Sequence, residues 1–192
     1  MPDLILASAS VQRKKLLKLT GARFKVIKSR ARETQKIKTT CSALVKHNAL
    51  LKARDVAKGL KKGVVIGADT VVYGGRKQLI GKPKTLKEAR SILESFFFRP
   101  HWVYTGVAVI DAATGRTFVD YEKTRVYMHK LSKEEIERYH RKTTPLDKAG
   151  GFDIEGRGGL FINRIEGCYS NVIGLPMAKL RLLLKKLNIS IL

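Results

Sequence analysis

Cysteine is almost absent from the chain. Only Cys41 and Cys168 occur among the 192 residues, and no CxxC motif or Cys/His cluster has the spacing of a zinc site. The four histidines show no ligand spacing either, so none is assigned to a metal. A disulfide between the two cysteines is kept as an alternative, although they stand far apart in sequence and most intracellular cysteines remain reduced.

Long hydrophobic runs are also missing. The chain has no run of about 18 or more apolar residues, so we expect no membrane-spanning helix, no membrane partner and a cytoplasmic location. Residues 1–6 lack a basic leader and are interpreted as leading into a first strand rather than as a signal peptide. A hydrophobic content of 44% is typical of a globular protein, and the length suits one domain, which we predict over residues 1–192.

Acidic residues are scarce. Lys and Arg number 39 against 16 Asp and Glu, a formal net charge of +23, and such a balance attracts polyanions. The basic residues are spread along the chain as single residues and doublets, with no block of six like charges and no repeat of aromatic residues with arginine that would indicate stacking on single strands. Two interpretations stay open: a solvated basic surface, or one binding face.

Hydrophobic patterning predicts an α/β fold with a mixed, twisted sheet that is flanked by helices. Apolar runs and turn signals indicate a series of short strands and helices. The expected strands are 4–7, 24–27, 64–72, 78–80, 102–111, 118–129 and 160–165. The expected helices are 11–19, 42–58, 86–97, 132–140 and 176–187, the fourth opened by a capping box at residues 132–135.

Residues 67–72 (GADTVV) are the most informative segment. The apolar run 64–66 leads into them and predicts a buried strand, with Asp69 at its end. A carboxylate on such a rigid element suits a metal ligand or a general base. Lys82 follows between a glycine and a proline, so one carboxylate and one fixed cation would suit a substrate that carries both metal and phosphate.

The segment 8–10 (SAS) lies between the first expected strand and helix. A helix N-terminus with small hydroxyl residues presents free N–H groups, which suits phosphate, and Arg13 one turn later can form a fork onto phosphate oxygens. The alternative is that Ser10 is simply an N-cap. No Walker loop is present.

Three further features each have a plain alternative. Glu33, in a polar loop over 30–38, could be a metal ligand or a surface charge. Lys52, on the long helix, could be functional or simply solvated. The glycine-rich stretch 147–151 could let the backbone approach a ligand, or could be an ordinary loop.

Five motifs in a fixed order resemble those of the Maf-like nucleoside triphosphate pyrophosphatases, and the resemblance covers residues 4–187. It implies hydrolysis of a nucleoside triphosphate to the monophosphate and pyrophosphate with a divalent metal, Mg²⁺ or Mn²⁺. It also implies an elongated α/β fold of two lobes around a cleft, similar to inosine triphosphatase, and a homodimer. The motifs are 6–10 with Arg13, 67–72, 81–83, 147–150, and 165–167 with 174–176.

The resemblance also implies roles for single residues. Asp69 would be the general base that activates water, and Glu33 would join it in holding the metal. The phosphates would be bound by Arg13, Lys52 and Lys82, above a loop lined by Ser8. Such a set of charges could neutralise the leaving pyrophosphate.

Three positions bear on base preference. The branch of the family that resembles dTTP/UTP pyrophosphatases has arginine where this chain has Gln12 and glutamine where it has Glu155, but shares Thr70. The branch that prefers 7-methylated guanine nucleotides shares the glutamate. Residues 68–72 favour pyrimidine triphosphates, and Glu155 could widen the range to cytosine or modified bases. The segment 96–98 (FFF) is expected to be partly packed at a lobe or dimer contact.

Two other functions stay open at this point. The chain could be a basic nucleic-acid-binding protein on an enzyme-like scaffold, in which the charge is the main feature. It could also be an interaction protein that affects cell division, a role attached to the resembled family. Asp69 separates the first alternative from the enzyme, because a carboxylate in a cationic site repels phosphate unless a metal is bound.

Overall fold

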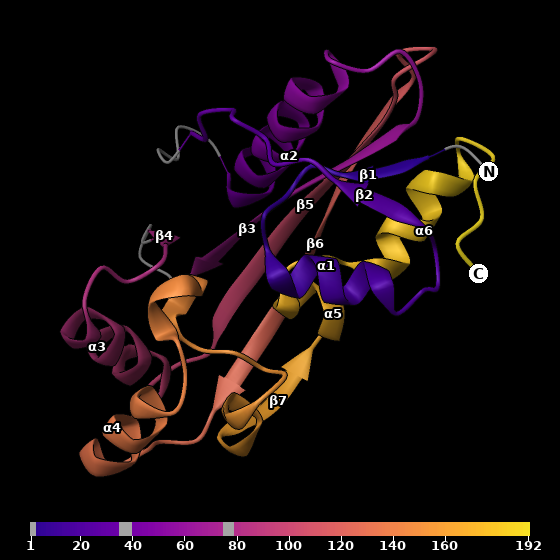
Figure 1. The fold of residues 1–192 in the computed structure, drawn as a ribbon. Coiled ribbons are helices and arrows are strands. Elements are labelled where there is room, and N and C mark those ends of the chain that lie inside the picture. The colour runs from indigo at the N-terminus through magenta and orange to yellow at the C-terminus, as the bar shows by residue number, and fades with distance from the viewer. Residues whose placement is uncertain (1–2, 35–39, 75–78) are drawn as a thin grey trace. The chain divides into compact units, whose positions relative to one another are not determined.

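The computed structural model describes residues 3–34, 40–74 and 79–192 (Figure 1). Within these residues seven strands form one sheet of order β2-β1-β3-β5-β6-β7, with β4 paired to β3. Strand β1 runs parallel to β2 and β3, whereas β3–β4 and β6–β7 are antiparallel, so the prediction of a mixed sheet is confirmed. The strands are β1 Leu4–Leu6, β2 Phe24–Val26, β3 Val64–Tyr73, β4 Leu79–Ile80, β5 His101–Asp111, β6 Thr117–Met128 and β7 Ile162–Glu166.

The helices agree with the prediction within one or two residues at most ends. They are α1 Val11–Lys18, α2 Cys41–Ala57, α3 Leu86–Phe96, α4 Lys133–Arg141, α5 Tyr169–Ile173 and α6 Met177–Lys185. The capping box at Ser132 and Glu135 is confirmed. No helix in the described ranges is long and apolar enough to cross a membrane.

Two expected element bounds were wrong, and one helix was missed. Helix α5 was not predicted, because five residues give too short a period to recognise. The strand expected at 160–165 starts at Ile162, since 157–160 forms a 3₁₀ turn that leaves Leu160 exposed. The helix expected over 11–19 ends at Lys18, and Leu19 after it is 83% exposed.

The chain forms two compact units. The first comprises Met1–Thr70, Thr105–Glu122 and Gly174–Leu192, and the second comprises Val71–Tyr104 and Lys123–Ile173. Strands β3, β5 and β6 each contribute residues to both units, because the division falls within them. The single domain over 1–192 and the cleft between two lobes stay predictions.

In the first unit, helix α2 lies directly against the backbone of β3 and β5. A Cβ on Gly67 would collide with the carbonyl oxygen of Ala49, and a Cβ on Gly106 would collide with that of Val45. Two glycines on the strands therefore permit this close approach, as closely packed interiors require. The core around them consists of Ile5, Ala7, Ala49, Ala53, Val56, Val65, Ala108 and Ile110. Helix α2 thereby holds its buried face, including two polar side chains, against β3.

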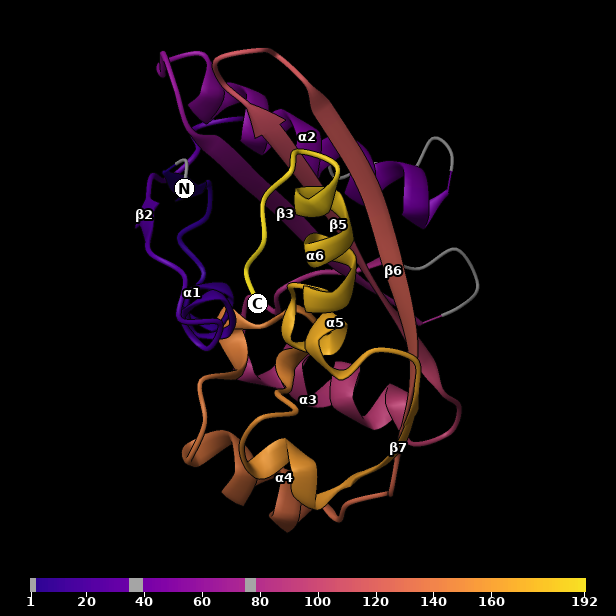
Figure 2. The same ribbon diagram turned by 90° about the vertical axis from the view of Figure 1, so that its right-hand side faces the viewer.

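The second unit has its own core. Its buried residues are Val72, Ile80, Leu93, Phe96, Val103, Val126, Ile136, Tyr139, Phe152 and Phe161, which come mainly from α3, α4 and the strands. The two helices are labelled in Figure 2. Phe96 is 2% exposed and stacks on His101, so the expected contact at a lobe or dimer surface is wrong for this ring. Phe98, by contrast, is 79% exposed.

Candidate active site

Asp69 lies within strand β3 rather than at its end, because β3 continues to Tyr73. The carboxylate is nearly buried, with the residue 4% exposed. Its Oδ1 accepts a hydrogen bond from Lys52 Nζ at 2.8 Å, and its Oδ2 accepts one from the Asn48 amide at 3.0 Å. Both donors stand on α2, so the docking of this helix on the sheet fixes the orientation of the carboxylate.

Lys52 is buried, and the interpretation of a solvated lysine is wrong. Besides Asp69, its Nζ lies 2.9 Å from Glu33 Oε1 and donates to the carbonyl oxygen of Ala68 at 3.3 Å. The Glu33 side chain is 47% exposed, in the loop that precedes α2. One ammonium group therefore bridges two carboxylates, of which one is enclosed and the other reaches solvent.

Asn48 is a site residue that sequence reasoning missed. Its Oδ1 accepts from the backbone N–H of Thr34, and its amide donates to the carbonyl oxygen of Thr34 and to Asp69, each at 3.0 Å. It thus ties the Glu33 loop to β3. The signal was its spacing of four residues from Lys52, which places two polar groups on one face of a helix that is otherwise buried through Leu44, Val45, Ala49 and Ala53.

Ser8 and Ser10 shape the turn between β1 and α1. Ser10 is the N-cap of α1, since its hydroxyl accepts from the Arg13 N–H, and phosphate binding at this helix N-terminus stays a prediction. The Ser8 hydroxyl is buried and accepts from the Ser10 N–H and from Arg13 Nη1, each at 3.2 Å. Gln12 is half-buried, and its Oε1 accepts from the Ser10 hydroxyl at 3.3 Å.

The Arg13 guanidinium is held by the protein on several sides. It donates to the carbonyl oxygens of Gly174 at 2.8 Å and Ala68 at 2.9 Å, and to the hydroxyl of Thr70 at 2.9 Å. With the bond to Ser8, four of the five guanidinium N–H groups have protein acceptors. Burial lowers the pKa of Arg13, while the negative charges of Asp69 and Glu33 oppose that shift.

Thr70 belongs to the same network. Its hydroxyl accepts from Arg13 and lies 3.0 Å from the hydroxyl of Thr105 on β5. A side chain that is half-buried and bonded in this way holds the strands and the Arg13 guanidinium together. Its predicted influence on base preference stays a prediction.

The structure therefore brings together the predicted residues of the first unit, namely Ser8, Gln12, Arg13, Glu33, Lys52, Asp69 and Thr70. Lys82 and Glu155 belong to the second unit and both are exposed, so their place beside Asp69 stays a prediction. Within that unit the glycine-rich stretch 147–151 forms 3₁₀ turns rather than a plain loop, and the Gly150 N–H donates to the carbonyl oxygen of Gly81, next to Lys82.

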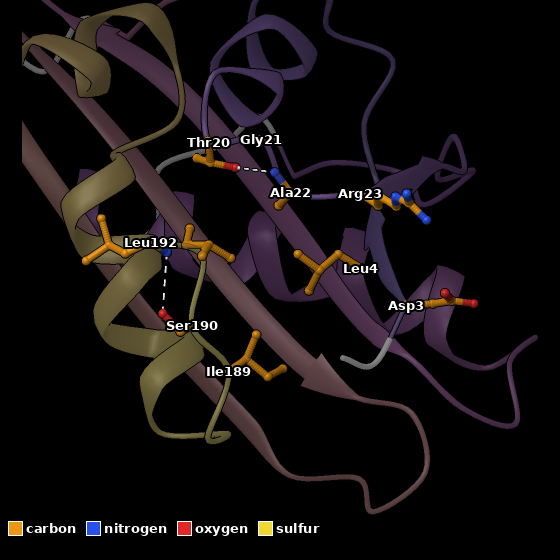
Figure 3. A pocket seen from close by; sticks show the side chains of 10 residues that line it. Asp3, Leu4, Thr20, Gly21, Ala22, Arg23, Ile189, Ser190 and Leu192 are labelled. Atoms are coloured by element: carbon orange, nitrogen blue, oxygen red, sulfur yellow. Dashed lines mark hydrogen bonds between the residues drawn. The ribbon is translucent and has the colours of Figure 1, made fainter.

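No group of three His, Cys, Asp or Glu side chains arranged to hold a metal occurs in residues 3–34, 40–74 and 79–192. Both cysteines are free thiols. A pocket of about 550 Å³ in the first unit contains none of the predicted site residues (Figure 3). It is lined by Asp3, Leu4, Thr20, Gly21, Ala22, Arg23, Ile189, Ser190, Ile191 and Leu192.

Comparison with known proteins gives consistent relatives. A family model described as "Maf-like protein" matches residues 3–187. The chain is 42% identical to a dTTP/UTP pyrophosphatase of Pelotomaculum thermopropionicum over all of both chains. It is 45% identical to a protein of the same name from Alkaliphilus oremlandii, over 96% of each chain.

Two solved structures are more distantly similar. They are Ham1 proteins of Staphylococcus aureus and Coxiella burnetii, at 17% and 16% identity. The TM-scores are 0.44 over 66% of this chain and 71% of the first, and 0.45 over 67% of this chain and 73% of the second.

Proposed function

The chain belongs to the Maf-like protein family, and on that premise we propose that it hydrolyses a nucleoside triphosphate to the nucleoside monophosphate and pyrophosphate. The observation that carries the proposal is the buried carboxylate of Asp69, oriented by Lys52 and Asn48 and linked through Lys52 to Glu33. A protein that only binds polyanions has no use for two carboxylates in this place, and the relatives' names favour the enzyme over that alternative.

Asp69 is the proposed general base. It would take a proton from a water molecule that attacks the α-phosphorus, so that pyrophosphate leaves. Lys52 holds Oδ1 and Asn48 holds Oδ2, which fixes the carboxylate on a rigid strand, and preorganised geometry of this kind lowers the barrier.

Glu33 and Asp69 are the proposed metal ligands. Carboxylate oxygens are the donors that Mg²⁺ and Mn²⁺ prefer, and Mg²⁺ in such sites is usually held by one or two carboxylates together with substrate phosphates, so the residues fit the ion. The bound metal would polarise the phosphate and stabilise charge on the leaving pyrophosphate. Lys52 contacts both carboxylates, so it would share their oxygens with the ion.

Phosphate binding is assigned to Arg13, Lys52 and Lys82, with Ser8 in the loop below. Arg13 donates mainly to the protein, so its part would be to hold the β1–α1 turn and to add positive charge rather than to form a bidentate fork on phosphate. Lys82 is exposed, so its ammonium group could contact the phosphates of a bound nucleoside triphosphate.

The proposed substrates are dTTP and UTP, the nucleotides in the names of the full-length relatives. Glu155 and Gln12 are the proposed sources of any difference in base preference, because a carboxylate only accepts hydrogen bonds whereas a glutamine both donates and accepts. A homodimer and a cytoplasmic location are part of the same proposal.

A panel assay tests the reaction. The protein would be offered each canonical and several modified nucleoside triphosphates with Mg²⁺ or Mn²⁺ in H₂¹⁸O, with pyrophosphate and orthophosphate measured separately. We expect pyrophosphate from dTTP and UTP and the label in the monophosphate, since attack at the α-phosphorus places the new oxygen there. Chelation by EDTA should abolish turnover, and added Mg²⁺ should restore it.

Asp69→Asn is the matched control because it keeps the shape of the side chain and removes the base. Turnover should fall about 10²–10⁴-fold, the usual contribution of a general base. Orthophosphate as the first product, or label in the pyrophosphate, would contradict attack at the α-phosphorus. Full activity of Asp69→Asn would remove Asp69 from the base role.

A further inference from the structure

The outer face of β5, β6 and β7 in the second unit carries aromatic and basic side chains. On β5, His101 and Val103 are buried while Trp102 between them is only half-buried. Side chains alternate between the two faces of a strand, so Trp102 points to the face opposite the core. The core of the second unit therefore covers one face of this part of the sheet.

Strand β6 repeats the same alternation. Thr124 and Val126 are fully buried, whereas Lys123 is exposed and Arg125 and Tyr127 are half-buried. These three side chains consequently lie on the face that carries Trp102.

Strand β7 completes the face. Its Arg164 pairs directly with Tyr127, and its Glu166 pairs with Arg125. Directly paired residues of antiparallel strands have neighbouring side chains on one face, so strand β7 places a third cation beside those of β6.

Cations and rings alternate across this face. Lys123 Nζ lies 5.2 Å from the centre of the Trp102 ring, and Arg125 Cζ lies 5.4 Å from the same ring. Arg125 Cζ also lies 5.1 Å from the Tyr127 ring, over which Arg164 Cζ lies at 4.3 Å. All four distances are within the range of cation–π attraction. We call these five residues the cation–aromatic row.

The row was not foreseen from the sequence, where no repeat of aromatic residues with arginine was found. The absence of such a repeat does not exclude the row, because its members come from three strands and become neighbours only through the pairing of the sheet. A pattern that arises across strands has no period along the chain.

The charge of the row selects an anionic partner. It contains three cations, and Glu166 is the carboxylate that contacts two of them, at 2.9 Å from Arg164 and 3.9 Å from Arg125. The side chains of Arg125 and Arg164 remain 38% and 59% exposed. In a chain of net charge +23, such a surface attracts polyanions over a longer range than the contact itself.

We propose that the cation–aromatic row binds single-stranded nucleic acid, with phosphates on the cations and unpaired bases against the rings and guanidinium planes. Proteins that hold single strands combine a basic track with aromatic platforms, and the row supplies both. A duplex hides its bases, and a polyanion without bases gains nothing from the rings. The row shares no residue with the Asp69 site, so the binding is a further function and stands or falls independently of the hydrolysis.

Trp102 makes the test direct, because it is the only tryptophan in the chain. Oligo(dT) of about 12 nucleotides should change the emission of Trp102, and a labelled copy should give the affinity by anisotropy. The three cations predict a slope of about −2 for log K against log salt, from about −0.7 per phosphate contact on a single strand. The double variant Arg125→Gln/Arg164→Gln should bring the slope to about −0.7 and weaken binding by about tenfold or more at low salt.

The matched control is Lys61→Gln/Lys62→Gln, which removes the same charge from an exposed doublet of the first unit. It should bind like the unchanged protein, and both double variants should retain pyrophosphate release and melting temperature. Equal weakening by both pairs, or equal affinity for heparin or for a duplex of the same length, would overturn the proposal. The proposal would also be overturned if the protein sedimented as a dimer, if only Arg125→Gln/Arg164→Gln dissociated that dimer, and if Trp102 did not respond to oligo(dT). The row would then be an interface between two copies of the chain.

Discussion

Lys52 and Asp69 form a buried ion pair in which Nζ lies 2.8 Å from Oδ1, while the same Nζ lies 2.9 Å from Glu33 Oε1. A buried pair adds little net stability, because removing two charges from water costs about as much as their attraction returns. Loss of one partner is different, since it leaves the other charge buried and uncompensated. The lysine is therefore needed by the fold as well as by the site.

Lys52→Met should lower the free energy of unfolding by about 3–5 kcal/mol, the usual cost of breaking a buried pair from one side. Urea unfolding followed by circular dichroism measures it. The double variant Lys52→Met/Asp69→Asn should recover part of that loss, because the unpaired carboxylate is gone. Strictly additive losses in the two single variants and the double variant would mean that the pair is not coupled.

Asn48→Leu should cost about 1–3 kcal/mol, because it leaves Asp69 Oδ2 and both backbone groups of Thr34 without their buried partner. Since Thr34 adjoins Glu33, the loop should loosen and the Mg²⁺ concentration for half-maximal turnover should rise. Asn48→Asp has the same shape but cannot donate to Asp69, and should impair turnover further by repulsion. An unchanged Mg²⁺ dependence in both variants would restrict Asn48 to the fold.

Gly67→Ala should lower the free energy of unfolding by about 1–3 kcal/mol or more, the usual cost of overpacking. The new Cβ meets the backbone of α2, which cannot move aside as a flexible side chain can. The displaced helix would carry Lys52 and Asn48 away from Asp69, so turnover should fall as well. Gly59→Ala is the control, since a Cβ there has only the Val56 carbonyl oxygen in contact, at 3.8 Å. Equal effects of the two substitutions would show that close docking of α2 is unimportant.

The sequence predicted the mixed α/β fold and most element positions, because helix and strand periods are local properties. It also predicted Asp69, Glu33, Lys52 and Arg13 as a group, but only through the resemblance to a known family. It could not reveal that Lys52 is buried between two carboxylates, since that depends on the two glycines that let α2 approach the sheet. The acceptors of the Arg13 guanidinium were equally hidden, because one of them, the carbonyl oxygen of Gly174, lies 161 residues away.

Asn48 and the cation–aromatic row illustrate a second limit. Asn48 looks like one polar residue in a helix, and its importance lies in bonds to Thr34 and to Asp69, 14 and 21 residues away. The row depends on strand pairing between β6 and β7. In both cases the relevant neighbours are set by tertiary contacts, which single-sequence patterns do not encode.

His101 lies in the core of the second unit with neither ring nitrogen bonded within the described residues. Its ring stacks on Phe96 at 3.8 Å between centroids and meets the edge of Phe152 at 5.2 Å. Burial among these rings lowers the pKa of His101 from 6.5 to about 3. The folded protein thus keeps the imidazole neutral where the unfolded chain protonates it.

The free energy of unfolding should consequently decrease as the pH is lowered from about 6.5 to 3, because the unfolded state binds a proton in this range that the folded state does not. From pH 7.5 to pH 5 the contribution of His101 is a loss of about 2 kcal/mol, at about 1.4 kcal/mol per pH unit below 6.5. His101→Leu replaces the imidazole by an apolar side chain of similar size and should remove that part of the pH dependence. His140 and the carboxylates contribute equally in both proteins. Urea unfolding at the two pH values gives the difference. Parallel losses in the original protein and the variant would mean that His101 is protonated in the folded state or reaches solvent.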